Sequence, residues 1–250
     1  MNCCSSLAEM AAEAGAGAPE VQRPAGASRD RRGRLLRGYL HKSSNSLCGI
    51  KGYASLIAGG PQNGGRSTAW ARKIIAEVER LEDIYRSVRE MAFPVPAPGL
   101  EAADPGHVVA DACDSASARH ANLRVGPIPA LRGRLLLPAG DLLQVIAALL
   151  DNAAESRPGP VAITLGTSLD GDGRRLLTIA DDGPGMPREL LTQAIDPFVT
   201  TREGHLGIGL SRVETIMDMH GLGWGLRSVP EAGTTVTLEI ATVGTTGSLR

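Results

Sequence analysis

One histidine lies on a stretch whose pattern predicts an amphipathic helix, and an asparagine one helical turn later could assist chemistry at its ring. In HKSSNSLCGIKGYASLI, His41 is followed four residues later by Asn45. Four residues rotate a helix by about 400°, so the two side chains would lie one turn apart on nearly the same face. An imidazole with a pKa near ~6.5 is substantially neutral at pH 7 and has a free lone pair. His41 is therefore a candidate nucleophile and Asn45 a candidate for orienting water, although the helix alone is more typical of a solvated surface histidine.

Two further stretches carry groups that bind ligands. In ALLDNAAES, Asn152 lies near the end of an apolar helix, where its carbonyl oxygen could complete the shell of a Mg²⁺ ion; alone, it is more typical of a helix cap. In IADDGPGMP, Asp181 ends a strand, and its carboxylate could accept a hydrogen bond from an exocyclic amine such as that of adenine. Gly183 and Gly185 would turn the backbone without a side chain to block a flat ligand, although the bare string is an ordinary turn.

A glycine-rich loop follows in FVTTREGHLGIGLSRVETI. Gly204, Gly207 and Gly209 lead into a helix N-terminus, where unpaired amides and the helix dipole favour phosphate. Arg202 could neutralise charge on a terminal phosphate. A lone glycine loop is weak evidence, but its position after an Asn-bearing helix and a D-x-G-x-G strand end makes a nucleotide site the stronger interpretation.

Two helices must position His41. The first has an apolar stripe with spacings of four and three: Leu36, Leu40, Ser43, Leu47, Ile50, Ala54 and Ile57. The second repeats this pattern: Ile74, Val78, Leu81, Tyr85, Val88 and Ala92. The pattern predicts a helical hairpin, which alone buries too little surface to be stable. We expect a second copy to complete a dimeric four-helix bundle; the alternative is packing against the C-terminal part of the same chain.

The second half of the sequence mixes helices and strands. We expect helices at 107–118, 141–156, 187–195 and 209–220, and strands at 123–125, VAITLGTSL, RRLLTIA, 224–229 and TTVTLEIAT. Strands with helices between them, and hairpins at the turns DGDG and PEAGT, indicate a mixed sheet with helices on one face. The predicted class is α+β, with a helical hairpin followed by an α/β sandwich.

Composition sets the boundaries and excludes several classes. The expected division is a mobile tail at 1–29, a hairpin at 30–93, a Pro-rich linker at 94–106, the sandwich at 107–243 and a tail at 244–250. A net charge of -1 without a long basic patch argues against nucleic acid. Four cysteines without paired spacing suit a reducing compartment, and no apolar run approaches the ~20 residues of a membrane span, so we expect a cytoplasmic protein.

In this order, the stretches resemble the histidine kinases of two-component signalling, whose ATP-binding fold is shared with gyrase B and the heat-shock chaperone ATPases. The resemblance covers about residues 35–240. HKSSNSLCGIKGYASLI resembles the H box, with His41 as phosphoacceptor, and is closest to soluble nitrogen-regulation-type kinases. ALLDNAAES resembles the N box, with Asn152 as magnesium ligand, and DDGPG resembles the G1 box, with Asp181 as adenine contact.

Three later stretches extend the resemblance. DPFVTTREG is similar to the F box and lid, GHLGIGL to the G2 box, and EAGTTVTLEI to the final strand. The nucleotide-binding residues that the resemblance implies are Asn152, Asp181, Gly183, Gly185, Thr201, Gly204, Gly207, Gly209, Leu210 and Thr234. It assigns catalysis to His41, Asn45 and Arg202, with ATP and Mg²⁺ as the implied cofactors.

The resemblance implies a homodimeric, ATP-dependent protein histidine kinase. It would phosphorylate its own His41 and pass the phosphoryl group to an aspartate of a response regulator receiver domain, and Asn45 would also allow hydrolysis of that phosphoaspartate. Because no sensor region is recognised before the hairpin, we expect the input to come from an upstream sensor protein or through the hairpin itself.

Two positions depart from the family pattern. Lys42 stands where the family usually has an acidic residue, and it cannot take the proton released on attack. Ala148 stands four residues before Asn152, where Asn or Glu is usual. These departures leave open an alternative, a non-catalytic histidine phosphotransfer or scaffold protein with a degenerate nucleotide domain. An anti-sigma-type serine kinase shares the ATP fold but leaves the His41 hairpin unexplained.

Overall fold

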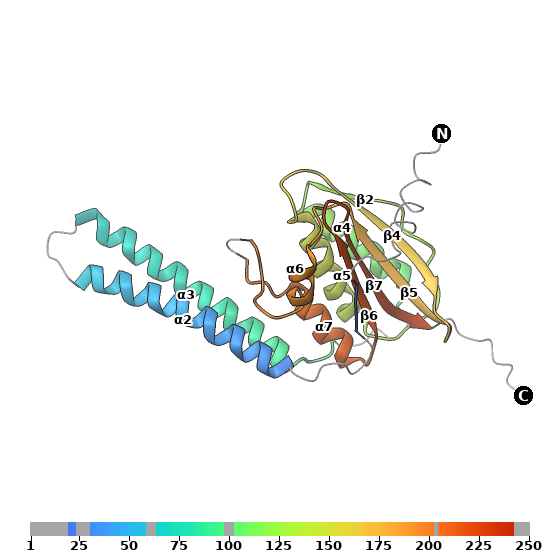
Figure 1. The fold of residues 1–250 in the computed structure, drawn as a ribbon, viewed down its shortest axis with the longest axis horizontal. Coiled ribbons are helices and arrows are strands. Elements are labelled where there is room, and N and C mark those ends of the chain that lie inside the picture. Colours follow the sequence, from blue (N-terminus) through green and yellow to red (C-terminus); the bar gives the residue numbers. More distant parts are fainter. Residues whose placement is uncertain (1–19, 24–30, 59–63, 98–102, 203–204, 243–250) are drawn as a thin grey trace, which may run out of the picture. The chain divides into compact units, whose positions relative to one another are not determined.

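The computed structural model describes residues 20–23, 31–58, 64–97, 103–202 and 205–242, which divide into two compact units (Figure 1). The hairpin unit contains residues 28–95 and 194–215, and the sheet unit contains 96–193 together with the chain's first 27 and last 35 residues. The predicted C-terminal tail, Gly204 and most of the predicted N-terminal tail lie outside the described residues. No helix in the described ranges has the length and apolar character needed to cross a bilayer.

The predicted hairpin is confirmed. Helix α2 spans Arg31–Ala58 and helix α3 spans Gly64–Ala92, and the two pack along their lengths. Leu35 and Ser46 of α2 and Ile84 and Met91 of α3 are buried. These residues repeat at helical spacing, so each helix buries one face against the other.

Several residues of the predicted apolar stripe of α2 are exposed in this single copy of the chain. Leu36, Leu40 and Leu47 are 57%, 55% and 57% exposed. The buried face begins one position earlier, at Leu35, and one residue rotates a helix by about 100°. Leu36, Leu40 and Leu47 therefore form an exposed apolar strip beside the buried face of α2.

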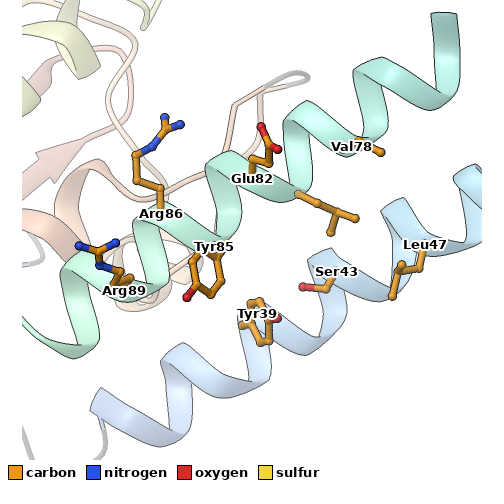
Figure 2. Close-up of a pocket in the computed structure, with 9 residues that line it drawn as sticks. Tyr39, Ser43, Leu47, Val78, Glu82, Tyr85, Arg86 and Arg89 are labelled. Atoms are coloured by element: carbon orange, nitrogen blue, oxygen red, sulfur yellow. The ribbon is translucent and has the colours of Figure 1, made fainter.

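A groove of about 510 Å³ lies along this outer side of the hairpin. Figure 2 shows Tyr39, Ser43 and Leu47 on α2 across from residues of α3. The α3 side of the groove consists of Val78, Leu81, Glu82, Tyr85, Arg86 and Arg89. The lining combines apolar and aromatic side chains with three charged ones, Glu82, Arg86 and Arg89.

Residues 194–215 pack on the end of the hairpin that carries the start of α2. Phe198 joins Leu35, Ile84 and Met91 in one buried cluster. A Cβ on Gly38 would collide with the Phe198 ring, so glycine is needed where the ring crosses α2. Charges surround this cluster, because Arg34 Nε lies 2.7 Å from Asp196 Oδ1 and its Nη2 lies 3.3 Å from Glu214 Oε2.

The sheet unit contains a mixed sheet with α4 and α5 on one face (Figure 1). Its strands are β1 (Glu20–Arg23), β2 (Leu123–Val125), β3 (Arg134–Leu135), β4 (Val161–Leu169), β5 (Arg174–Asp181), β6 (Trp224–Val229) and β7 (Gly233–Thr242). The order is β1-β6-β7-β5-β4-β2, with β3 paired to β7 and only β2–β4 parallel among these pairs. Its helices are α4 (Pro105–Arg119), α5 (Ala139–Ala154) and α6 (Arg188–Gln193). A further helix, α7 (Gly209–Met219), begins in the hairpin unit and ends in the sheet unit. Buried and exposed residues alternate in β4, as expected for a sheet with one covered face.

Several predicted boundaries need correction. Residues 20–23, placed in the tail, form β1 and pair with β6. Helix α4 begins inside the predicted linker, because the Asp104 carboxylate accepts hydrogen bonds from the N–H groups of Gly106 at 2.7 Å and His107 at 3.3 Å and so caps the helix. Helix α5 begins two residues early, because the carbonyl of Pro138 already accepts its first hydrogen bonds. Helix α6 is shorter than predicted, and β3 was not predicted.

Candidate nucleotide site

Three polar side chains form a row across neighbouring strands of the sheet unit. Asp181 at the end of β5 lies opposite Thr234 of β7, which in turn lies opposite Ser228 of β6. Side chains directly opposite one another in a sheet point to the same face. Ile179 and Val236 are buried and stand two residues from members of the row, so the row lies on the helix-covered face, at its end.

Asp181 is held by backbone hydrogen bonds on one of its oxygens. Its Oδ1 accepts from the N–H groups of Gly183 at 2.9 Å and Thr234 at 3.3 Å. The pKa of this carboxyl is raised, primarily by burial, while the two backbone hydrogen bonds act in the opposite direction. These bonds fix the carboxylate through Oδ1, and in the described part of the chain no hydrogen bond reaches Oδ2.

Glycines bring the backbone close around this carboxylate. Gly185 has φ +64°, and a Cβ there would collide with the carbonyl oxygen of Val229. A Cβ on Gly183 would lie 2.7 Å from both Asp181 Oδ1 and Ser156 Oγ. Both predicted glycines are therefore required by the backbone path, and together they form a cradle beside Asp181 with no side chain of their own.

The sequence interpretation missed two serines of this site. Ser228 Oγ accepts from the Met186 N–H at 2.9 Å, lies 2.8 Å from Thr234 Oγ1 and donates to the Gly233 carbonyl at 3.1 Å. Ser156 Oγ is buried, and no described group is in position to hydrogen bond with it. Ser156 stands four residues after Asn152, so helical spacing could have indicated it, whereas Ser228 is apparent only from the strand register.

This arrangement fits the base of an adenine nucleotide. A half-buried carboxylate with one oxygen outside these hydrogen bonds can accept from an exocyclic amine, and a buried hydroxyl without a partner is costly unless a ligand or water satisfies it. Asn152, half-buried in the last turn of α5, offers the type of amide oxygen that suits Mg²⁺.

The residues predicted to contact phosphate lie in the hairpin unit. Gly207 and Phe198 both have positive φ, and the Phe198 N–H donates to the Gly207 carbonyl at 2.7 Å, which closes the loop that leads into α7. Helix α7 begins at Gly209, as predicted. The Arg202 N–H donates to Thr200 Oγ1 at 3.1 Å. Thr201 is exposed, and Leu210 follows Gly209 in the first turn of α7.

His41 and Asn45 are both exposed and lie one turn apart on α2, as the spacing predicts. Lys42 is partly buried, and its pKa is lowered by burial and then by the Arg80 guanidinium of α3. The cation that follows His41 therefore lies on the α3 side of the helix. Helix α2 contains no Asp or Glu, so it offers His41 no carboxylate base.

Replacement of Gly185 by Ala tests the cradle. Because the new Cβ would meet the Val229 carbonyl at a positive φ, we expect the free energy of unfolding to fall by about 1–3 kcal/mol or more. Urea titration followed by circular dichroism measures this change. Gly171→Ala is the matched control, since a Cβ there meets nothing within 4 Å. Equal stabilities of the two variants would show that the close approach is not required.

Replacement of Asp181 by Asn tests the cost of the half-buried carboxylate. A carboxyl whose pKa is raised on folding binds its proton more tightly in the folded chain, so stability is lost as the pH rises through the folded pKa. We therefore expect Asp181→Asn to be more stable than the wild type at pH 7, with a difference that shrinks on acidification. Urea unfolding at several pH values measures this, with exposed Asp172→Asn as control. A pH-independent difference would contradict the assignment.

Comparison with known proteins gives a consistent family. Residues 139–243 match the family described as histidine kinase-, DNA gyrase B-, and HSP90-like ATPase. The chain is 31% identical over 199 residues to the sensory histidine kinase/phosphatase NtrB of Rhodobacter capsulatus, covering 74% of this chain and 55% of NtrB. It is 28% identical over 216 residues to the sensor histidine kinase ZraS of Klebsiella oxytoca, covering 85% of this chain and 46% of ZraS.

The chain spans about half the length of these curated relatives. Among solved structures, the histidine kinase AdeS of Acinetobacter baumannii has the same fold, with a TM-score of 0.54 and 18% identity over 82% of this chain and 98% of that one. Residues 139–243 therefore carry an ATPase domain of the histidine kinase type, and the chain is similar to sensor histidine kinases over about three quarters of its length or more.

Proposed function

We propose that the chain is an ATP-dependent protein histidine kinase that phosphorylates its own His41. The observation that carries the proposal is the pairing, in one chain, of an exposed histidine on a helical hairpin with a half-buried carboxylate whose two backbone hydrogen bonds go to the same oxygen. ATP is the substrate, and Asp181 and the neighbouring polar row bind its base. Gly207, Gly209 and Arg202 bind its phosphates.

The proposed step is an in-line displacement at the γ-phosphorus. The unprotonated ring nitrogen of His41 forms the new N–P bond, the bond to the bridging oxygen of ADP breaks, and ADP leaves. The other ring nitrogen then releases its proton to water, because α2 holds no carboxylate to accept it. Positioning and charge neutralisation by Arg202 and the loop amides supply most of the rate. Mg²⁺, held by Asn152, would neutralise charge on the phosphates.

We further propose that two copies associate through the outer side of the hairpin. The groove in Figure 2 lies between the exposed stripe of α2 and Val78 and Tyr85 of α3, which are 41% and 62% exposed. These stripes keep the heptad spacing of a packed bundle. A second hairpin would cover them and complete a homodimeric four-helix bundle around the groove.

The proposed recipient is an aspartate of a response regulator receiver domain. Its acidic phosphorylation site would meet a helix whose charges are all cationic, including Arg37, Lys42 and Lys51. Asn45, exposed beside His41, would orient water for hydrolysis of the resulting phosphoaspartate. An upstream sensor protein supplies the input. The expected cytoplasmic location stays a prediction.

Incubation with labelled ATP tests the nucleophile. We expect acid-labile, alkali-stable phosphoprotein in the wild type and none in His41→Ala, because only an N–P bond has this pattern of lability. His107→Ala, an exposed histidine of α4, should keep the label and serves as control. Label that persists in His41→Ala would exclude the assignment. Calorimetry with ADP distinguishes the alternative of a degenerate phosphotransfer protein, which would bind little or none.

Asn45→Ala tests the second activity. If Asn45 orients the water that attacks phosphoaspartate, the variant should lose partner dephosphorylation by about tenfold or more while keeping autophosphorylation. The release of phosphate from a prephosphorylated receiver domain measures this. Ser44→Ala, the exposed neighbour, should leave both activities intact. Equal loss of both activities in Asn45→Ala would point to local damage rather than to this role.

A further inference from the structure

A buried carboxylate in the sheet unit holds the segment that leads from the hairpin. The backbone N–H of Ala97 donates to Asp141, with its nitrogen 3.2 Å from Oδ1 and 3.3 Å from Oδ2. Asp141 lies in the first turn of α5 and is 1% exposed. Its Oδ2 also lies 2.7 Å from Nε2 of His220, whose side chain is 14% exposed. One carboxylate thus joins three separate segments of the chain.

The packing around this carboxylate is equally close. A Cβ on Gly140 would lie 2.8 Å from the Cβ of Ala97, which is shorter than real carbon contacts. The linker therefore rests directly on the first turn of α5, and glycine at position 140 is what permits it. Glycine within a helix otherwise lowers its stability relative to alanine, so the close contact accounts for its presence.

The backbone at the end of α7 holds His220 in place. His220 directly follows α7, and its backbone N–H donates to the Ile216 carbonyl at 3.3 Å. Gly221, with φ +64°, ends the helix in a left-handed turn. A carboxylate only accepts hydrogen bonds, so His220 donates through Nε2. Burying this carboxylate is unfavourable unless both donors are present, which makes the arrangement depend on Ala97 and His220 together.

We infer that Asp141 and His220 form a clamp on Ala97 that couples the linker to the nucleotide site. Asp141 begins α5, and the last turn of α5 carries Asn152. His220 ends α7, and the first turn of α7 carries Gly209 and Leu210. Displacement of the linker therefore acts on both helices that carry proposed nucleotide-binding residues. This last step rests on the proposed function, whereas the clamp itself does not.

Hydrogen exchange of the full-length chain tests the clamp without nucleotide. His220→Ala should accelerate exchange of the Ala97 amide by about tenfold or more, while amides of β5 and β7 keep their protection. His220→Gln, whose amide can still donate to Asp141, should restore much of the protection. His107→Ala is the control on an exposed histidine. Unchanged exchange at Ala97 in His220→Ala would overturn the clamp.

Gly140→Ala decides the question if His220→Ala does not fold. This variant keeps both the Asp141 and the His220 side chains and favours the helix, but its Cβ displaces Ala97. We expect the same acceleration at the Ala97 amide, and normal protection there would overturn the clamp.

Calorimetric titration with ADP tests the coupling. Both clamp variants should bind ADP about fivefold or more weakly than the wild type. If the variants show fast exchange at the Ala97 amide but bind ADP with unchanged affinity, the coupling is overturned while the clamp itself is supported. A wild type that binds no ADP would overturn the proposed function and the coupling, while hydrogen exchange would still decide the clamp.

Discussion

The account depends on a carboxylate that the fold holds in an unfavourable place. Asp181 is half-buried at the end of β5, and partial burial raises its pKa, yet the two backbone N–H groups that hold it bind the same oxygen. The backbone at Gly185 and Gly233 approaches so closely that neither position has room for a Cβ. A chain that keeps such a group sacrifices stability for a binding geometry, which is typical of functional sites.

The hairpin helices use different faces for packing and for chemistry. Each of its helices has buried residues that are directly followed in the sequence by exposed apolar side chains. Leu35 and Leu36 are neighbours in sequence, yet one is buried and the other is more than half exposed. The face with His41 and Asn45 is a third side of α2, so packing and chemistry do not compete for the same residues.

Local sequence patterns predicted most of the helices and strands. They could not predict contacts between segments that are distant in the sequence. The hairpin, the strands from β4 to β7 and the α7 start at Gly209 follow from periodicity and turn residues. The pairing of Ser228 with Thr234, and the approach of Ser156 to Gly183, arise only when distant segments meet. The early start of α4 could have been predicted, because Asp104 followed by Pro105 is a helix-start signal. Strand β3, with two residues, is too short to have a period.

The central claim is that the open oxygen of Asp181 recognises the base of a nucleotide. Calorimetric titration of Mg·ADP into the wild type and into Asp181→Asn tests it most directly, because the substitution keeps the shape of the side chain and removes its charge. The account predicts saturable binding by the wild type and an affinity lower by about tenfold or more in the variant, as for a lost hydrogen bond to a charged group. Equal affinities, or no binding by the wild type, would contradict it.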